Sequence, residues 1–311
     1  MVTSKVNGDG NYTSLCSTGL HGTYQEIVYS TVNSTLAVNA ILGNFLIIAA
    51  LQKVSSLHPP SKLLLGCLAT TDLCVGLITQ PINTRFLASP ENSKSCYYLN
   101  LLFDSTAVIF GGVSLLTLTA ISVDRLLALL SGLRYRQVVT LRRAWIFVAV
   151  FWLFCLGVAM MFLYNFLITI FIICIVMSFC ILTSILCYTK IYLKLRHQQA
   201  QVQENVYRGQ TNSERSSLNI ERYKKTVSSA LWVQITLVVC YLPYIIVPSI
   251  TAITEMHTQF LDLFWEVTIS LVLFSSSLNP FLYCWKMKEV RQGVKVTIRQ
   301  LWCFWNFYII A

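Results

Sequence analysis

The longest uncharged stretch of this chain, from Ala144 to Thr189, contains 46 residues without an acidic or basic side chain. As one α-helix it would be roughly 69 Å long, about twice the thickness of a bilayer, because each residue advances a helix by about 1.5 Å. The stretch therefore has to reverse direction, and we expect the turn at Tyr164-Asn165 near its middle. This feature predicts two adjacent membrane-spanning helices joined by a very short loop.

Other long stretches with few charges complete a set of seven predicted spans. The composition agrees, because 55% of the residues are hydrophobic and 12% are charged, about half the charge of a soluble domain. An apolar excess of this size requires lipid as the solvent. The remaining spans are predicted over residues 27–52, 62–85, 96–123, 226–254 and 261–285.

The sequence therefore predicts an all-α integral membrane protein, a seven-transmembrane helix bundle over residues 27–285. Residues 1–26 are polar and lack the apolar core of a cleavable signal peptide, so they are expected to form an extracellular N-terminal segment. A polar stretch rich in Gln, Asn and Ser predicts an inner loop over about residues 197–221. Residues 286–311 form a cytoplasmic tail.

The tail has the pattern of a short amphipathic helix lying on the inner leaflet of the membrane. Basic residues occupy the faces that its periodic apolar residues leave free, which favours contact with membrane lipid. Cys303 is a candidate palmitoylation site near this helix. The apolar residues at helical spacing are Val290, Val294, Ile298 and Leu301.

The distribution of basic residues orients the bundle. With the N-terminus outside, all but Lys5, Arg85 and Lys94 of the 23 Lys and Arg residues lie in inner segments. The positive-inside rule therefore predicts an extracellular N-terminus in the plasma membrane, and the net charge of +10 indicates membrane topology rather than nucleic-acid binding. Two glycosylation sequons, at Asn11 and Asn33, agree, although Asn33 lies close to the membrane.

Short motifs occur on the predicted spans in a fixed order, and together they resemble the rhodopsin-like (class A) G-protein-coupled receptors over nearly the whole chain. Each motif alone is weak, but the full ordered set is specific. The motifs are Gly43-Asn44, Leu68-Ala69-Thr70-Thr71-Asp72, Asp124-Arg125, Trp152, Tyr188, Cys240-Tyr241-Leu242-Pro243 and Asn279-Pro280-Phe281-Leu282-Tyr283. The very short loop after the fourth span, the absence of proline from the fifth and the stretch Phe103-Asp104-Ser105 loosely resemble the melanocortin receptors, and other stretches the adenosine receptors.

The resemblance implies an allosteric sodium site in the bundle and no other cofactor. A carboxylate as deep in the membrane as Asp72 costs a few kcal/mol and requires partners. In the family this position binds sodium together with the positions of Ser114, Ser275 and Asn279. Their oxygen-containing side chains suit a hard cation. The alternative is a protonated, hydrogen-bonded packing residue.

The resemblance also implies coupling to a heterotrimeric G protein. Asp124 would hold Arg125 in the inactive state, and on activation the sixth helix would move outward so that Arg125 meets the G protein. Prolines in the sixth and seventh helices would kink them and allow this movement. The residues assigned to coupling and activation are Asp124, Arg125, Leu133, Tyr188, Pro243, Asn279, Pro280 and Tyr283.

Several positions depart from the family pattern. Leu126 replaces a tyrosine, Gly132 a proline and Tyr241 a tryptophan, and Tyr223 stands where an acidic residue often restrains the arginine. These departures suggest the hypothesis that Arg125 is weakly restrained and that basal signalling is appreciable. The outer loop that normally carries a disulfide cysteine has none. Cys16 and Cys96 are the only two cysteines predicted to lie outside, so we predict that they pair; the alternative is two free thiols, which an oxidising compartment disfavours.

Ligand identity is not evident from the sequence, which allows a small molecule or a peptide. Ala107 stands where amine receptors carry an aspartate, which disfavours a biogenic amine as the ligand. Pro248 stands where adenosine receptors carry a purine-binding asparagine, which disfavours adenosine. No lysine lies between Lys225 and Lys286 to hold retinal. Asp104 and Glu266 are candidates for contact with a cationic ligand. The full set of ligand-pocket candidates is Asp104, Ala107, Gly111, Tyr241, Tyr244 and Glu266.

A membrane transporter or channel is the alternative function. It would need several polar groups at the bilayer midplane and usually repeated halves, whereas this chain has one deep acid, an odd number of spans and no visible repeat. An enzyme is not expected, because the four histidines lie in loops or at span ends without metal or triad spacing.

Overall fold

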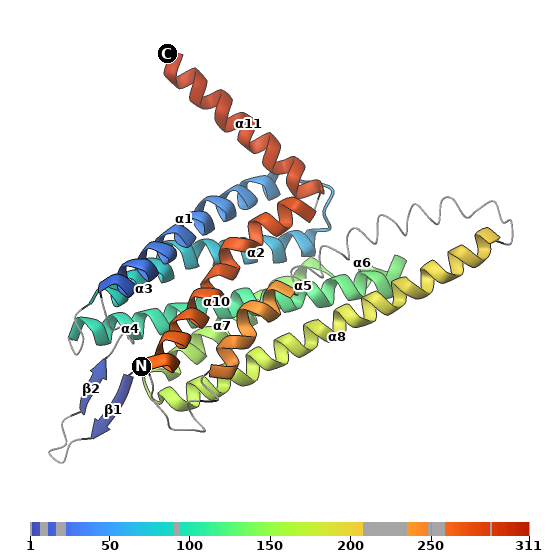
Figure 1. Ribbon diagram of the computed structural model, residues 1–311. Helices are drawn as coiled ribbons and strands as arrows, with labels where there is room; N and C mark the ends of the chain where they lie inside the picture. The colour runs from blue at the N-terminus through green and yellow to red at the C-terminus, as the bar shows by residue number, and fades with distance from the viewer. Residues whose placement is uncertain are drawn as a thin grey trace.

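A computed structural model describes residues 2–6, 12–16, 23–89, 94–207, 235–247, 250, 259–286 and 288–310. Its helices form one bundle, and Figure 1 shows a β-hairpin beside one end and the C-terminal helix at the other. We call the end with the hairpin the outer end and the opposite end the inner end.

Six helical segments are long and apolar enough to cross a membrane, and a seventh apolar helix, Ile235–Val247, is shorter within the described residues. The all-α seven-helix prediction is confirmed. The second and third spans each contain a turn of π-helix. In chain order the spans are α1 (Thr23–Lys53); α2 (Pro59–Cys74), η1 (Val75–Thr79) and α3 (Gln80–Leu87); α4 (Lys94–Thr106), η2 (Ala107–Gly111) and α5 (Gly112–Ser131); α7 (Leu141–Met161); α8 (Phe166–Tyr207); the helix Ile235–Val247; and α10 (Gln259–Lys286).

The long uncharged stretch reverses where the sequence predicted. α7 ends at Met161 and α8 begins at Phe166, so Tyr164 and Asn165 lie in the turn between them. The Asn165 side chain accepts a hydrogen bond from the backbone N–H of Ile168 at 3.1 Å and so caps the first turn of α8. A turn this short forces α7 and α8 to lie antiparallel beside each other.

α8 differs from the prediction at its inner end. It continues to Tyr207, so the first ten or so residues of the expected polar inner loop at 197–221 are helical. Gln, Ala and Glu dominate this part of the sequence, and such residues readily prolong a helix that has already formed. Figure 1 shows this end of α8 reaching beyond the neighbouring inner helix ends.

The N-terminal hairpin was not expected. β1 (Val2–Val6) pairs antiparallel with β2 (Tyr12–Cys16), with Val2 opposite Cys16. The intervening sequence contains Asn-Gly and Asp-Gly pairs, which are strong hairpin turn signals.

Polarity in the bundle is arranged as a membrane requires. The exposed side chains of α8 include Phe171, Ile175 and Phe179, one turn apart, and Phe179 is 67% exposed. In contrast, Asp72 is 0% exposed and Asn44 1%. Apolar groups therefore face the lipid and polar groups face one another, since hydrocarbon offers no hydrogen bonds.

The first and seventh spans meet at a contact that only glycine permits. A Cβ atom at Gly43 would lie 2.8 Å from Cγ of Pro280. One turn along this interface, the Asn44 amide donates to the carbonyl of Ser276 at 3.1 Å and to that of Ala40 at 2.9 Å. The Gly43-Asn44 motif therefore fixes α1 against the proline-containing part of α10.

We expect Gly43→Ala to destabilise the bundle, because the added methyl group overlaps the Pro280 ring and overpacking costs about 1–3 kcal/mol. The thermal midpoint of the detergent-solubilised protein should fall by several degrees. Gly66→Ala is the matched control, since nothing lies within 4 Å of a Cβ at Gly66. A midpoint in Gly43→Ala no lower than in Gly66→Ala would contradict this assignment.

The amphipathic helix of the tail is α11 (Lys288–Ile310), 23 residues long. Its first half packs on the inner end of α1, where a Cβ at Gly293 would lie 3.0 Å from the carbonyl oxygen of Ala50. The Lys53 ammonium donates to the Gln300 side chain. Figure 1 shows α11 running across the direction of the spans, with its C-terminal half extending away from the bundle. The Cys303 side chain lies outside the described residues.

Candidate functional site: an inner network, a buried acid and an outer cavity

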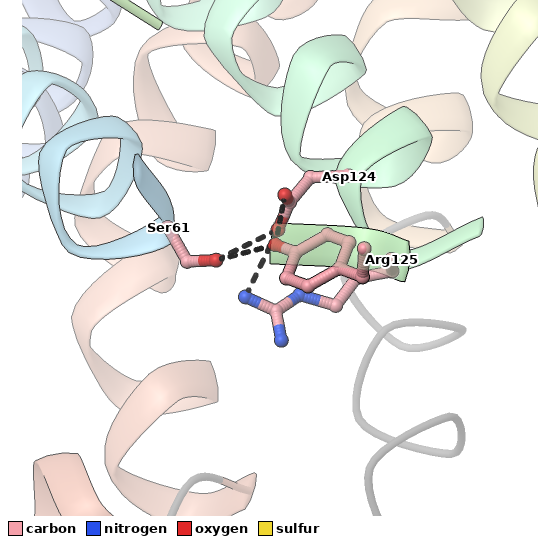
Figure 2. A network of polar contacts seen from close by, with 4 residues as sticks. Ser61, Asp124 and Arg125 are labelled. Atoms are coloured by element: carbon pink, nitrogen blue, oxygen red, sulfur yellow. Dashed lines mark hydrogen bonds and ion pairs between the residues drawn. The ribbon is translucent and has the colours of Figure 1, made fainter. Parts of the chain in front are cut away.

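Asp124, near the inner end of α5, is the centre of a hydrogen-bonded group that we call the inner network (Ser61, Asp124, Arg125 and Tyr135). Its Oδ2 accepts from the Ser61 hydroxyl at 2.9 Å and lies 3.3 Å from Nη2 of Arg125. Its Oδ1 accepts from the Tyr135 hydroxyl at 2.5 Å. Figure 2 shows Ser61 and Arg125 approaching the carboxylate from different sides. Asp124 is only 4% exposed, and these three contacts compensate its buried charge.

Gly132 positions the tyrosine of the inner network. It has a φ of 49°, which is in the left-handed region that favours glycine, and it ends α5. The chain then forms the short helices η3 (Gly132–Arg134) and α6 (Tyr135–Val138), which return Tyr135 toward Asp124. Burial, together with the hydrogen bond donated to Asp124, raises the pKa of Tyr135 to about 12. Its hydroxyl therefore stays protonated and remains a donor at physiological pH.

Further activation candidates surround the network within the membrane. Tyr188 is buried on α8 with Ile191 and Leu195, and Leu126 packs against this group. The tyrosine that the family places at Leu126 is thus replaced by an apolar contact. Tyr283 on α10 is buried, and its hydroxyl has no hydrogen-bond partner among the described residues.

The structure describes the two prolines among the remaining coupling candidates. Pro243 lies within the helix Ile235–Val247 and Pro280 within α10, as expected for kinks. The Leu133 side chain and the whole of Tyr223 lie outside the described residues, so the hypothesis that the sixth helix restrains Arg125 only weakly stays a prediction.

Asp72 is the centre of a second polar group, halfway along the bundle. Its Oδ1 accepts from the Ser114 hydroxyl at 2.9 Å and its Oδ2 from the Asn279 amide at 2.7 Å. The Ser276 side chain also hydrogen-bonds this carboxylate. The Ser275 hydroxyl donates instead to the carbonyl of Val272 at 2.6 Å, and its oxygen lies 3.3 Å from the Tyr241 hydroxyl. Three of the four predicted sodium-site residues therefore meet directly, and Ser276 was missed.

The donor set around Asp72 fits a small hard cation. It combines one carboxylate with hydroxyls and a side-chain amide, all buried, and carboxylate and hydroxyl oxygens suit alkali and alkaline-earth ions rather than transition metals. Among the described residues, no group of three or more His, Cys, Asp or Glu side chains is arranged to hold a metal ion.

A cavity lies in the outer half of the bundle, and we call it the outer cavity. It encloses about 880 Å³ of space, counting the part open to solvent. Five of the six ligand-pocket candidates line it, namely Asp104, Ala107, Gly111, Tyr241 and Tyr244. These five residues lie on the third and sixth spans, and the rest of the lining includes residues of α7, α8 and α10.

Glu266 is a correction to the predicted pocket. It is 5% exposed and does not line the outer cavity, although its neighbour Trp265 does. Successive residues on a helix point about 100° apart, so Glu266 faces another side of α10. The Glu266 carboxylate interacts electrostatically with Tyr29 of α1, so it lies on the side of α10 that faces the first span.

Asn33 is a second correction. Its side chain is 4% exposed, and its amide donates to the carbonyl of Gln80 and to the Thr84 hydroxyl, both at 3.0 Å. A nitrogen buried between α1 and α3 cannot carry a glycan in this fold. The sequon pattern does not report burial, which is why it misled. Asn11 lies outside the described residues, and its glycosylation stays a prediction.

Cys96 is disulfide-bonded. The eight cysteines described within the spans are free thiols, as expected for small buried apolar residues. β2, which ends at Cys16, contacts α4, which contains Cys96. The Cys16 side chain lies outside the described residues, so its pairing with Cys96 stays a prediction that mass spectrometry of the non-reduced protein decides.

Comparison with known proteins agrees with this architecture. The family model described as "7 transmembrane receptor (rhodopsin family)" matches residues 43–170 and 162–283. The chain therefore belongs to the rhodopsin family of seven-transmembrane receptors, and it is a G-protein-coupled receptor.

Individual relatives are distant but nearly full length. Melanocortin receptor 5 of Bos taurus is 25% identical over 96% of this chain and 92% of its own. Adenosine receptor A3 of Canis lupus familiaris is 26% identical over 86% and 89%. Trace amine-associated receptor 9 of Homo sapiens is 22% identical over 84% and 82%. The loose resemblance to melanocortin and adenosine receptors is confirmed.

Proposed function

We propose that this receptor binds an extracellular ligand in the outer cavity and signals to a heterotrimeric G protein through Arg125. The inner network is the observation that carries the proposal. It holds Arg125 at 3.3 Å from a buried carboxylate, at the inner end of a helix that also lines the outer cavity through Leu116. One element thus connects the outer cavity to a restrained arginine.

Activation would require the sixth helix to move outward and release Arg125. The Tyr241 hydroxyl is bonded to Ser275 beside the Asp72 group, while its ring lines the outer cavity. A ligand that contacts Tyr241 therefore acts on the same helix that must move. Such a ligand shifts the equilibrium only by as much as it prefers one arrangement over the other.

The same proposal places the protein in the plasma membrane with its N-terminus outside. The hairpin then lies in the extracellular medium, and the basic inner segments and α11 lie at the cytoplasmic leaflet, as the positive-inside rule requires. No finding supports a transporter.

The test is nucleotide exchange on purified G proteins. Membranes containing the receptor should accelerate GTPγS binding to at least one Gα class, over membranes from mock-transfected cells, either spontaneously or with a ligand. Failure with every Gα class and a broad ligand library, at confirmed surface expression, would reject the proposed coupling.

We further propose that Asp72, Ser114, Ser276 and Asn279 hold an allosteric sodium ion. Binding at about ten times the dissociation constant stabilises a fold by about 1.4 kcal/mol, which shifts a thermal midpoint by roughly 2–4 °C. Replacing choline chloride by sodium chloride should raise the midpoint of the wild type by this amount and leave Asp72→Asn unchanged. Asp104→Asn is the control, because Asp104 is an acidic residue outside this group, and its midpoint should respond to sodium like that of the wild type. An equal sodium response in Asp72→Asn would reject the site.

A further inference from the structure

The start of α2 is rigid, and His58, the last residue of the first inner loop, leads into it. His58 is the N-cap of this helix, and Pro59 and Pro60 occupy its first two positions. Because proline has a fixed φ and no backbone N–H, it is pre-formed for the first turn of a helix. The His58 side chain makes no capping hydrogen bond, so its ring is available for a contact with another element.

That ring packs against Tyr135 of α6, in the second inner loop. The two ring centroids are 5.0 Å apart, and the ring planes are inclined by 50°. Aromatic rings attract each other at centroid separations between about 4.5 and 7 Å. The contact therefore joins the first inner loop to the residue that donates a hydrogen bond to Asp124.

A hydrogen bond does not explain where the histidine lies. Its Nδ1 atom is buried and has no hydrogen-bond partner among the described residues. A buried nitrogen without a partner destabilises a fold, so this edge of the imidazole is not held in place as a donor or an acceptor. The buried edge of the His58 ring thus serves packing rather than hydrogen bonding.

The start of α2 also holds Tyr135 at a second point. Ser61, in the first turn of the helix, has its Oγ 3.3 Å from the Tyr135 hydroxyl. The same hydroxyl donates to Oδ1 of Asp124 at 2.5 Å. A tyrosine hydroxyl lies at the far end of its ring, and rotation about χ1 and χ2 moves that ring. A contact that fixes the tilt of the ring therefore fixes the hydroxyl on the carboxylate.

We propose that His58 is a positioning residue for the restraint on Arg125. Its ring holds Tyr135 so that the hydroxyl stays on Asp124, which in turn holds the guanidinium. The inference rests on the proposed coupling through Arg125. It extends the inner network to the first inner loop, and it assigns the role to the ring of His58 rather than to its nitrogens.

His58→Asn removes the ring without weakening the start of α2. Asparagine is a favourable N-cap residue, so the helix should be at least as stable as in the wild type. Nucleotide exchange without ligand should rise roughly two- to five-fold at equal receptor density. This range lies between the contribution of a weak aromatic pair and that of the Tyr135 hydrogen bond itself.

His58→Phe is the conservative variant, because it keeps a ring and removes both nitrogens. It should retain the basal exchange of the wild type, since Nδ1 makes no hydrogen bond among the described residues that phenylalanine would lose. His197→Asn is the matched control. His197 is an exposed histidine of α8 on the inner side, and its replacement should also leave basal exchange unchanged.

A second background shows whether His58 acts through the tyrosine hydroxyl. In Tyr135→Phe that hydroxyl is already absent, so adding His58→Asn should raise basal exchange no further. If the two substitutions instead multiply each other's effects, His58 acts by another route and the proposal is wrong.

Thermal midpoints of the same purified variants test the ring contact without a G protein. In a double-mutant cycle of His58→Asn and Tyr135→Ala, the two midpoint shifts should fail to add by about 1–4 °C, the size expected for one aromatic pair. The effect of asparagine as an N-cap cancels in this cycle, because both variants that carry His58→Asn contain it.

Additive midpoints, unchanged or lower basal exchange in His58→Asn, or an equal rise in His58→Phe and His58→Asn would each overturn the proposal. Lower exchange would place His58 in direct contact with the G protein instead. Non-additive midpoints without exchange on any Gα class would reject the proposed coupling, while supporting the position that His58 gives to Tyr135. The two failures are therefore distinguishable.

Discussion

Arg125→Ala should reduce G-protein activation to the level of mock-transfected cells while leaving surface expression intact. The guanidinium is 25% exposed and lies at the inner end of the bundle, where it is available to a partner once Asp124 releases it. Charge-assisted hydrogen bonds of arginine contribute about 1.5–3 kcal/mol, so loss of this side chain should lower activation at least about ten-fold. Nucleotide exchange at matched receptor density measures the effect.

Arg136→Ala is the control for this variant. Arg136 lies on α6, eleven residues after Arg125 in the chain, and is exposed outside the inner network. It should lower activation by far less than Arg125→Ala does. Strong signalling by a well-expressed Arg125→Ala receptor would show that the arginine does not contact the G protein as proposed.

Tyr135→Phe should raise basal signalling. The substitution removes the hydroxyl that donates to Asp124 at 2.5 Å and leaves the ring in place, so the carboxylate holds Arg125 with one partner fewer. If that bond exists only in the inactive arrangement, its loss of about 1 kcal/mol shifts the equilibrium roughly five-fold toward activity. Nucleotide exchange without ligand, at equal surface density, is the measurement.

Tyr192→Phe serves as the matched control, because Tyr192 is on α8 and 52% exposed. Its basal activity should equal that of the wild type. The pKa of Tyr135, at about 12, further predicts that the difference between Tyr135→Phe and wild type is constant between about pH 6 and 8. A basal rate in Tyr135→Phe no higher than in the wild type would mean that this hydroxyl does not restrain Arg125.

The spans could be predicted because each depends on a property that the sequence states directly. Charge is excluded from lipid, so the uncharged stretches located the helices, and the length of the stretch from Ala144 to Thr189 required the reversal now seen between α7 and α8. The Asp72 group was also partly predictable. A deep carboxylate needs partners, and motif positions on other spans supplied Ser114 and Asn279.

What could not be predicted depends on the direction in which a side chain points. Asn33 and Glu266 both lie near span ends in the sequence, but packing turned Asn33 toward α3 and Glu266 toward α1. Tyr135 was missed for a related reason. Its contact with Asp124 depends on the left-handed turn at Gly132, and the conformation of that turn is not evident from the sequence.

The turn between α7 and α8 also determines how a ligand leaves. It spans only residues 162–165, too few to fold over the outer cavity as a lid. If a ligand binds in this cavity as proposed, its dissociation past the ends of α7 and α8 would therefore not wait for this turn to open.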